Sequence, residues 1–332
     1  MPFASVFGHS RPLGLLARSI GRGTLPPSLL FTGPDGVGKR LAAQAVAEAL
    51  NCLSPKDGDA CGVCTACRRI AKGSHPDVLA IEPPEVGATK IDLVRPAIAA
   101  AAYRPFEGRC RVIIVNDADR LTDDAANALL KSLEEPPAGT VFILVSARPE
   151  VLLPTIRSRC SQLRFGRLSA GDVARFLIER EGVDAQEAHA VAAVADGSPG
   201  RALEAGTRAY RDGRTAALST LRGVSTAASP KARLQAAAGL MAGKASSAGE
   251  RDELSTRVAM LASLLRDVAL VAHGGPDEQL ANADLADDLR ALAPSFDSRR
   301  GWRGFAAADR ALAALRRNAS PKVVAAWLAV SI

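Results

Sequence analysis

The chain has 332 residues, which is too long for one core of ordinary size and indicates two or three domains. Hydrophobic residues make up 48% of it and aromatic residues only 4%, so the composition suits a globular, helix-rich protein and disfavours an all-β architecture. A net charge of +7 suits an anionic partner such as nucleic acid, whereas the lack of a secretory signal and of an apolar run of roughly 18 residues predicts a cytoplasmic protein without a membrane partner.

Strands and helices alternate between residues 25 and 167. The predicted strands are apolar runs, and they cover residues 28–32, 77–81, 111–116, 140–146 and 162–165. Helical spacing of apolar residues predicts helices over 10–22, 41–50, 90–102 and 122–133, the last with Thr122 as its N-cap. This alternation predicts an α/β domain built on a parallel sheet.

A glycine-rich segment joins the first predicted strand to the helix that follows it. Its sequence is Gly33-Pro34-Asp35-Gly36-Val37-Gly38-Lys39-Arg40, which meets the phosphate-loop pattern G-x-x-x-x-G-K in full. We expect the backbone of Gly33, Gly36, Val37 and Gly38 to surround a phosphate, and Lys39 to reach the outer phosphates of a nucleotide such as ATP or ADP. Arg40 stands where Ser or Thr normally holds Mg²⁺, so the loop suits nucleotide binding better than hydrolysis.

Four cysteines lie close together after that helix. Cys52, Cys61, Cys64 and Cys67 have the spacing C-x8-C-x2-C-x2-C, which suits a tetrahedral Zn²⁺. Four cysteines leave no open coordination position, so the predicted zinc is structural. Free buried cysteines are the alternative, and a redox Cys-x-x-Cys pair would leave two of the four unexplained.

Beyond Leu168 the strand signals end and the remaining sequence has a helical pattern. Ser169 is a predicted N-cap, and helices are predicted over 170–181, 185–195 and 199–205. Later apolar residues recur four and three positions apart, at Leu254, Val258, Leu261, Leu265 and Val268. Small or polar residues at 242–249 and 273–276 predict linkers.

The domain organisation follows from these patterns. We expect an α/β domain over residues 1–167 with a zinc module at 52–74, a small helical domain over 168–207, and a helical bundle over 208–332.

Several local sequences resemble the clamp-loader subunits of bacterial DNA polymerase III, within the AAA+ superfamily. The resemblance covers nearly the whole chain, and it is carried by 30–34 with 36–39, the cysteine cluster, 125–137, 155–160 and 318–322. It implies an AAA+ P-loop domain, a small helical lid and a C-terminal helical collar through which subunits assemble. The partners that it implies are gamma/tau and delta clamp-loader subunits, with the sliding clamp and primed DNA reached through the complex.

Within that family the chain is more similar to the delta-prime class than to the ATP-hydrolysing gamma/tau class. His75-Pro76-Asp77 and the segment 91–95 fit the delta-prime class better. An active subunit carries Asp-Glu after the central strand, whereas Asp117 is followed here by Ala118. We expect ATP hydrolysis by this chain to be weak or absent. As a component of the polymerase complex, the chain is also not expected to polymerise DNA itself. The alternatives are an active gamma/tau-type ATPase and, less favoured, a zinc-containing nucleic-acid-binding protein.

The resemblance also implies roles for individual residues. Arg159, within Ser158-Arg159-Cys160, is expected to act in trans at the nucleotide of a neighbouring subunit, with Arg157 as an auxiliary contact. Asp117 and Ser146 are expected at the phosphates, and Arg201 is expected to reach the chain's own nucleotide. The alternatives are a buried strand-end hydroxyl for Ser146 and a solvated arginine at a helix start for Arg201.

Overall fold

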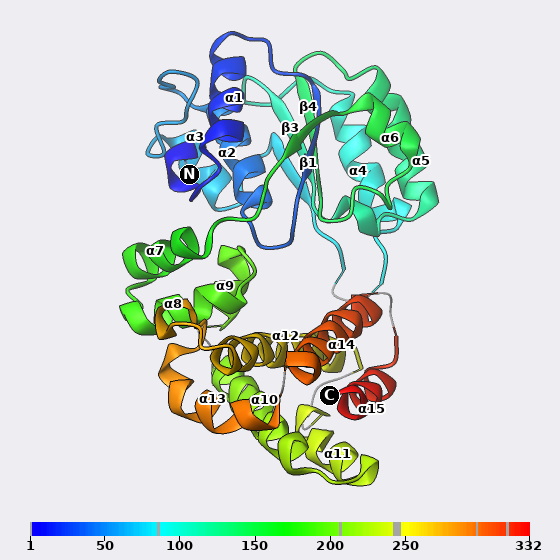
Figure 1. Ribbon diagram of the computed structural model, residues 1–332. Helices are drawn as coiled ribbons and strands as arrows, with labels where there is room; N and C mark the ends of the chain where they lie inside the picture. The colour runs from blue at the N-terminus through cyan, green and yellow to red at the C-terminus, as the bar shows by residue number, and fades with distance from the viewer. Residues whose placement is uncertain (1, 85–86, 206–207, 242–246, 297, 317–318) are drawn as a thin grey trace. The chain divides into compact units, whose positions relative to one another are not determined.

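The computed structural model describes residues 2–84, 87–205, 208–241, 247–296, 298–316 and 319–332 (Figure 1). The chain divides into two compact units, Met1–Leu168 and Ser169–Ile332. The predicted boundary at residue 207 lies outside the described residues, so the division of the second unit into lid and collar stays a prediction.

A parallel five-stranded sheet lies at the centre of the first unit. Its strands are β1 (Ser28–Thr32), β2 (Val78–Ile81), β3 (Arg111–Val115), β4 (Thr140–Ser146) and β5 (Ser161–Arg164). They are arranged in the order β2-β3-β4-β1-β5, and every neighbouring pair is parallel. The three inner strands are buried along their whole length, which is why they read as continuous apolar runs. The prediction of a parallel α/β sheet is confirmed.

Helices cover both faces of this sheet (Figure 1). One face packs mainly on α1 (Ser10–Gly21), α2 (Lys39–Asn51) and α3 (Thr65–Ala71), and the other on α4 (Ile91–Ala101), α5 (Asp123–Glu134) and α6 (Pro154–Arg159). Alternate strand residues serve the two cores: Phe31 and Ile114 point to the first, whereas Leu30 and Ile113 point to the second. Two short 3₁₀ turns complete the unit, η1 (Phe3–Ser5) and η2 (Ala118–Arg120).

The described residues of the second unit are helical and contain no strand. They form α7 (Ala170–Glu181), α8 (Ala185–Val194), α9 (Pro199–Ala205), α10 (Arg208–Thr226), α11 (Pro230–Ala236), α12 (Ser247–Ala272), α13 (Ala286–Leu292), α14 (Ser298–Arg316) and α15 (Pro321–Ser331). Short 3₁₀ turns are η3 (Ala237–Met241), η4 (Asp277–Gln279), η5 (Ala283–Leu285) and η6 (Ala293–Ser295). The long helix α12 contacts α10 and α14, and its predicted apolar stripe from Leu254 to Val268 is buried.

Two sequence features fall partly outside the described ranges. Residues 242–246 of the predicted linker at 242–249 lie outside the described ranges, and α12 begins at Ser247, within that predicted linker. The motif at 318–322 begins with Asn318, which lies outside the described residues. Its Pro321 is the first residue of α15, a position that suits proline.

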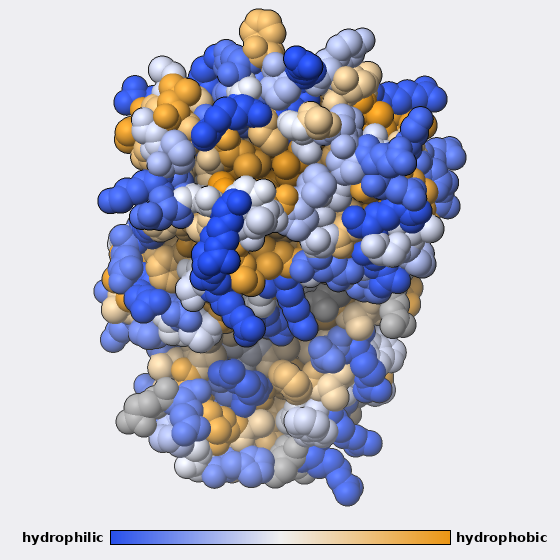
Figure 2. All heavy atoms as spheres, turned by 90° about the horizontal axis from the view of Figure 1, so that it is seen from above, coloured by the Kyte–Doolittle hydropathy of each residue, from blue (hydrophilic) through white to orange (hydrophobic). Residues whose placement is uncertain are grey.

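Within the described ranges, none of the helices has both the length and the apolar character needed to cross a membrane. Figure 2 shows hydrophobic side chains in small groups between hydrophilic ones on the face in view.

Candidate functional site

The phosphate loop connects the end of β1 to the start of α2. Gly33, Gly36 and Gly38 all have positive φ, at 145°, 71° and 106°. At Gly33 a Cβ atom would lie 2.0 Å from the carbonyl oxygen of Phe165, so the close approach of the residue after β5 requires glycine there. The loop therefore has the backbone conformation that its sequence predicts, with Gly38 as the residue before helix α2.

The Lys39 side chain is folded into this loop. It is only 6% exposed, and its Nζ donates hydrogen bonds to the carbonyl oxygens of Gly33 (2.7 Å) and Pro34 (2.6 Å). His9 contacts the same loop, and its Nε2 lies 2.7 Å from the carbonyl oxygen of Val37. Burial lowers the pKa of His9. Sequence reasoning did not single out His9, since its contact depends on the packing of the chain before α1.

Arg40, in helix α2, is paired with the carboxylate of Glu82, which follows strand β2. Its guanidinium donates to Glu82 Oε1, at the C-terminal end of β2. The same Glu82 oxygen accepts a hydrogen bond of 3.0 Å from Asn116 Nδ2, at the end of β3. Asn116 is 4% exposed, and its Oδ1 has no hydrogen-bond partner among the described residues. Glu82 and Asn116 were not predicted as site residues, although Glu82 follows a predicted strand and Asn116 ends one, where ligands bind in such sheets.

The acidic residues after β3 have separate environments. Asp117 has a left-handed backbone conformation, and burial, together with the neighbouring Asp35 and Asp119, raises its pKa. Asp119 instead faces the end of β4, where it accepts hydrogen bonds from Ser146 Oγ (2.8 Å) and from Arg148 Nε (2.9 Å). The structure thus joins Ser146 to Asp119, a contact that sequence reasoning did not predict.

The residue after Asp117 carries no functional group. Ala118 is buried, with 1% exposure, and begins the 3₁₀ turn η2. Its methyl group cannot orient a water molecule, and weak hydrolysis by this site stays a prediction.

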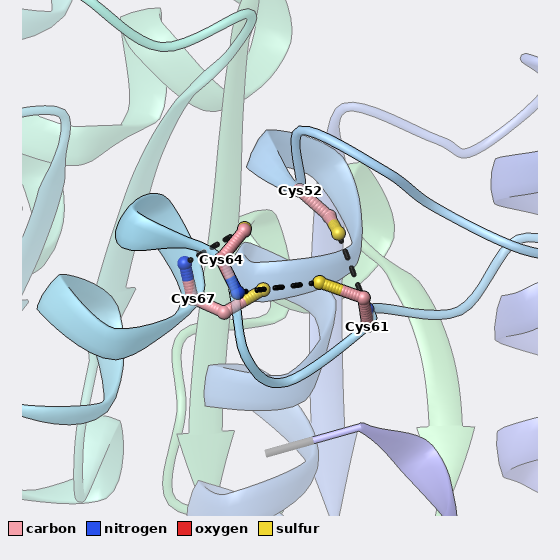
Figure 3. A group of neighbouring side chains, drawn as sticks. All are labelled: Cys52, Cys61, Cys64 and Cys67. Carbon is pink, nitrogen blue, oxygen red and sulfur yellow. Dashed lines mark hydrogen bonds between the residues drawn. The ribbon is translucent and has the colours of Figure 1, made fainter.

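The four clustered cysteines lie where the chain leaves α2 and enters α3 (Figure 3). Their sulfur atoms all lie within 4.8 Å of one another. In a tetrahedral site with Zn–S distances of about 2.3 Å, sulfur atoms are about 3.8 Å apart. Backbone N–H groups also point at the sulfurs, from Cys61 to Cys52 (3.2 Å) and from Cys64 to Cys61 (3.4 Å). The four residues fit a metal ion, consistent with the predicted structural zinc.

Two of these thiols ionise more easily than the other two. Backbone N–H groups of Val63 and Cys64 lower the pKa of Cys61. Burial opposes ionisation of Cys64, but N–H groups and neighbouring thiols lower its pKa to about 6. Burial raises the pKa of Cys52 and Cys67. A metal that binds all four must release protons, so its affinity is expected to fall as pH falls.

Metal analysis tests this assignment. We expect about one zinc per purified chain, and Cys67→Ser to lower the content several-fold, because it removes one of four ligands. Cys110→Ser is the matched control, since Cys110 is outside the cluster and should leave the zinc content unchanged. A zinc-free chain that is fully folded would contradict the assignment.

Arg159 ends helix α6 with its guanidinium partly exposed. The side chain is 32% exposed, and its Nε and Nη2 both lie 3.0 Å from Glu134 Oε2 on α5. Its Nη1 also donates to the carbonyl oxygen of Thr155 (3.2 Å). The next residue, Cys160, is buried, which raises the pKa of its thiol to about 11. Cys160 therefore anchors the turn, while the arginine is restrained but accessible.

Arg201 belongs to the second unit, at the start of α9. Its backbone N–H donates to Ser198 Oγ (3.2 Å), and its guanidinium lies 3.7 Å from Asp196. Its role at the nucleotide stays a prediction, because the phosphate loop belongs to the other unit.

Asp77 forms a buried network that sequence reasoning did not assign. Its carboxylate is completely buried, accepts hydrogen bonds from the N–H groups of Phe106, Glu107 and Gly108 at 2.7–2.9 Å, and pairs with Arg111 at 2.8 Å. Burial alone would raise the pKa of Asp77, but these hydrogen bonds lower it to about 2. The network fixes the segment before β3 onto the start of β2.

The sequence comparisons found relatives among DNA polymerase III subunits. Residues 8–169 match the family described as DNA polymerase III, delta subunit. The DNA polymerase III subunit delta' of Pseudomonas aeruginosa is 42% identical over 143 residues, which is 43% of this chain and 44% of that protein. The subunit tau of Escherichia coli is 35% identical over 171 residues, or 52% of this chain and 26% of that protein. The matched segments thus span less than half the length of these relatives.

Solved structures with similar chains have lower sequence identity. A DNA polymerase III gamma-subunit-related protein from Thermotoga maritima is 18% identical, with a TM-score of 0.39, over 91% of this chain and 99% of that one. The DNA clamp loader delta protein of Bacillus subtilis is 12% identical, with a TM-score of 0.34, over 95% of this chain and 97% of that one.

Proposed function

We propose that this chain, whose resemblance to the clamp-loader subunits of DNA polymerase III is confirmed by its sequence relatives, acts as a delta-prime-type subunit of such a complex. It assembles with gamma/tau and delta subunits and helps them to place a sliding clamp on primed DNA. The observation that carries the proposal is Arg159, a partly exposed guanidinium held at the end of α6 by Glu134.

Arg159 would act at the ATP site of a neighbouring subunit. A planar guanidinium stabilises the negative charge that develops on the phosphoryl oxygens during transfer. Glu134 restrains the side chain before the neighbour arrives, and a phosphate would then compete with Glu134 for it. The helical second unit supplies the lid and the collar through which subunits assemble.

The chain's own nucleotide site supports binding more than hydrolysis. Its glycines and Lys39 have the arrangement of a phosphate loop. Arg40 occupies the position of a magnesium ligand, and Ala118 provides no group that could position water. The zinc, held by four cysteines, is structural.

A gamma/tau-type ATPase is the second candidate function. It is favoured by the intact G-x-x-x-x-G-K loop and by the tau relatives, which match a longer segment than the delta' relative does. The two functions differ in whether the isolated chain turns over ATP.

Reconstitution tests the proposal. Mixing the full chain with gamma/tau and delta subunits is expected to give a complex that loads a clamp on primed DNA, and omitting the chain should reduce loading at least about tenfold, because one neighbouring ATP site then lacks its arginine. The isolated chain should show little ATP turnover. Robust turnover that Lys39→Ala abolishes would favour the gamma/tau-type ATPase, and failure to join the complex would contradict both.

A further inference from the structure

The start of helix α2 carries two adjacent cations and no acidic residue. Lys39 and Arg40 are its first two residues. A positive charge in the first turn opposes the helix dipole, so it is unfavourable there unless an anion lies beside it. In this structure the anion beside Arg40 is the carboxylate of Glu82.

This arrangement does not fit a magnesium ion. A guanidinium has only N–H donors and a permanent positive charge, so Arg40 cannot coordinate a cation and repels one. The first polar residue after β3 is Asn116, whose neutral amide is already hydrogen-bonded to Glu82. The Glu82 oxygen that faces Arg40, Oε1, already accepts hydrogen bonds from both Arg40 and Asn116.

Arg40 can exchange the carboxylate of Glu82 for a phosphate. The Arg40–Glu82 pair is solvent-accessible, with side-chain exposures of 65% and 43%, so its net strength is small. If Arg40 turns to a phosphate, Glu82 keeps Asn116 as a donor and no buried charge is left alone. Guanidinium groups bind phosphate through paired N–H groups, which makes phosphate the stronger partner.

We propose that the phosphate loop binds a nucleoside di- or triphosphate without magnesium, with Arg40 supplying the charge that the metal would otherwise provide and Glu82 holding Arg40 while the loop is empty. This inference rests on the nucleotide pocket of the proposed function. The ligand that it assigns to the site is the metal-free nucleotide, in place of the nucleotide's magnesium complex.

Binding of fluorescent ADP and ATP to the full, zinc-loaded chain, in magnesium-free buffer without a chelator and in excess MgCl₂, tests this. The wild-type chain should bind as tightly or more tightly without magnesium, because magnesium complexes the nucleotide and lowers the concentration of its metal-free form. Arg40→Thr should bind several-fold more weakly without magnesium and should gain about tenfold on adding it, since a hydroxyl is restored where the metal ligand belongs. Glu82→Gln should bind about two- to fivefold more tightly, because Arg40 loses a competing charge but Asn116 keeps its acceptor.

Two controls complete the experiment. Lys39→Ala should abolish binding in both buffers, which places the ligand in the loop. Arg95→Thr removes a similarly exposed arginine, 66% exposed on α4, and should change neither affinity. A wild-type chain whose affinity magnesium raises about fivefold or more, roughly the largest effect of an exposed ion pair, would overturn the inference. A chain that binds neither nucleotide would also overturn it, while assembly and clamp loading would still test the proposed function separately.

Discussion

Replacing Arg159 with alanine is expected to lower ATP hydrolysis at the neighbouring site about a thousandfold, while the complex still assembles. The guanidinium stabilises charge that is present only in the transition state, so its removal should act on the rate and not on nucleotide affinity. DNA-stimulated ATPase activity and loading of a labelled clamp on primed DNA, both measured on the reconstituted complex, report this effect.

The fold should tolerate this change. The Arg159–Glu134 pair is partly exposed, so it contributes at most about 1 kcal/mol to the free energy of unfolding. Arg159→Lys keeps the charge but loses the planar fork, and should recover little activity. Arg95→Ala, an exposed arginine in another helix of the same unit, is the matched control. Unchanged ATPase and loading rates in the alanine variant would remove the trans role of Arg159.

Replacing Asp77 with asparagine is expected to lower the free energy of unfolding of the first unit by about 3–5 kcal/mol. The substitution leaves Arg111 without its buried counterion and turns an amide group toward N–H donors of the 106–108 segment. Urea denaturation followed by circular dichroism measures the loss. Asp92→Asn is the control, because Asp92 is 78% exposed and pairs with the exposed Arg95, and it should change stability by less than about 0.5 kcal/mol.

The same residue predicts an acid dependence. The pKa of Asp77 is about 2 in the folded chain, below its ordinary value of 3.8. Because the folded state favours the charged form, Asp77 stabilises the fold above pH 3.8, and this stabilisation is lost as pH falls from there toward 2. It amounts to about 2 kcal/mol. The stability difference between the wild type and Asp77→Asn should therefore shrink over this range. A difference that stays constant from pH 5 down to 2.5 would contradict the prediction.

Local patterns were enough to predict several features of this chain. The apolar strands are buried on both faces of the sheet, so their burial is visible as continuous apolar runs. The cysteine cluster could be predicted because three of its four ligands lie within seven consecutive residues. Thr122 and Ser169 were predicted as N-caps, and each accepts a hydrogen bond from the N–H three residues later.

Contacts between distant segments could not be predicted in this way. Arg40 and Asn116 both reach Glu82 only because the sheet brings the ends of β2 and β3 beside the start of α2. Ser146 was predicted at the phosphates, but its hydrogen bond to Asp119 depends on the pairing of β3 with β4. Asp77 was recognised within a family motif, without its role as the buried anchor of residues 106–108.

The sequence by itself determined the strands of the first unit and four of the helices between them, the glycine-rich loop, the spacing of the clustered cysteines and the resemblance to clamp-loader subunits, since each depends on residues near one another in the chain. The tertiary structure decided which charges meet. Asp77 and Glu82 flank the same strand, β2, yet one is buried under three N–H groups and the other is exposed beside Arg40. Their environments differ because the energy of a charge depends on its solvation and its partners, and both are set by segments that fold onto it from elsewhere.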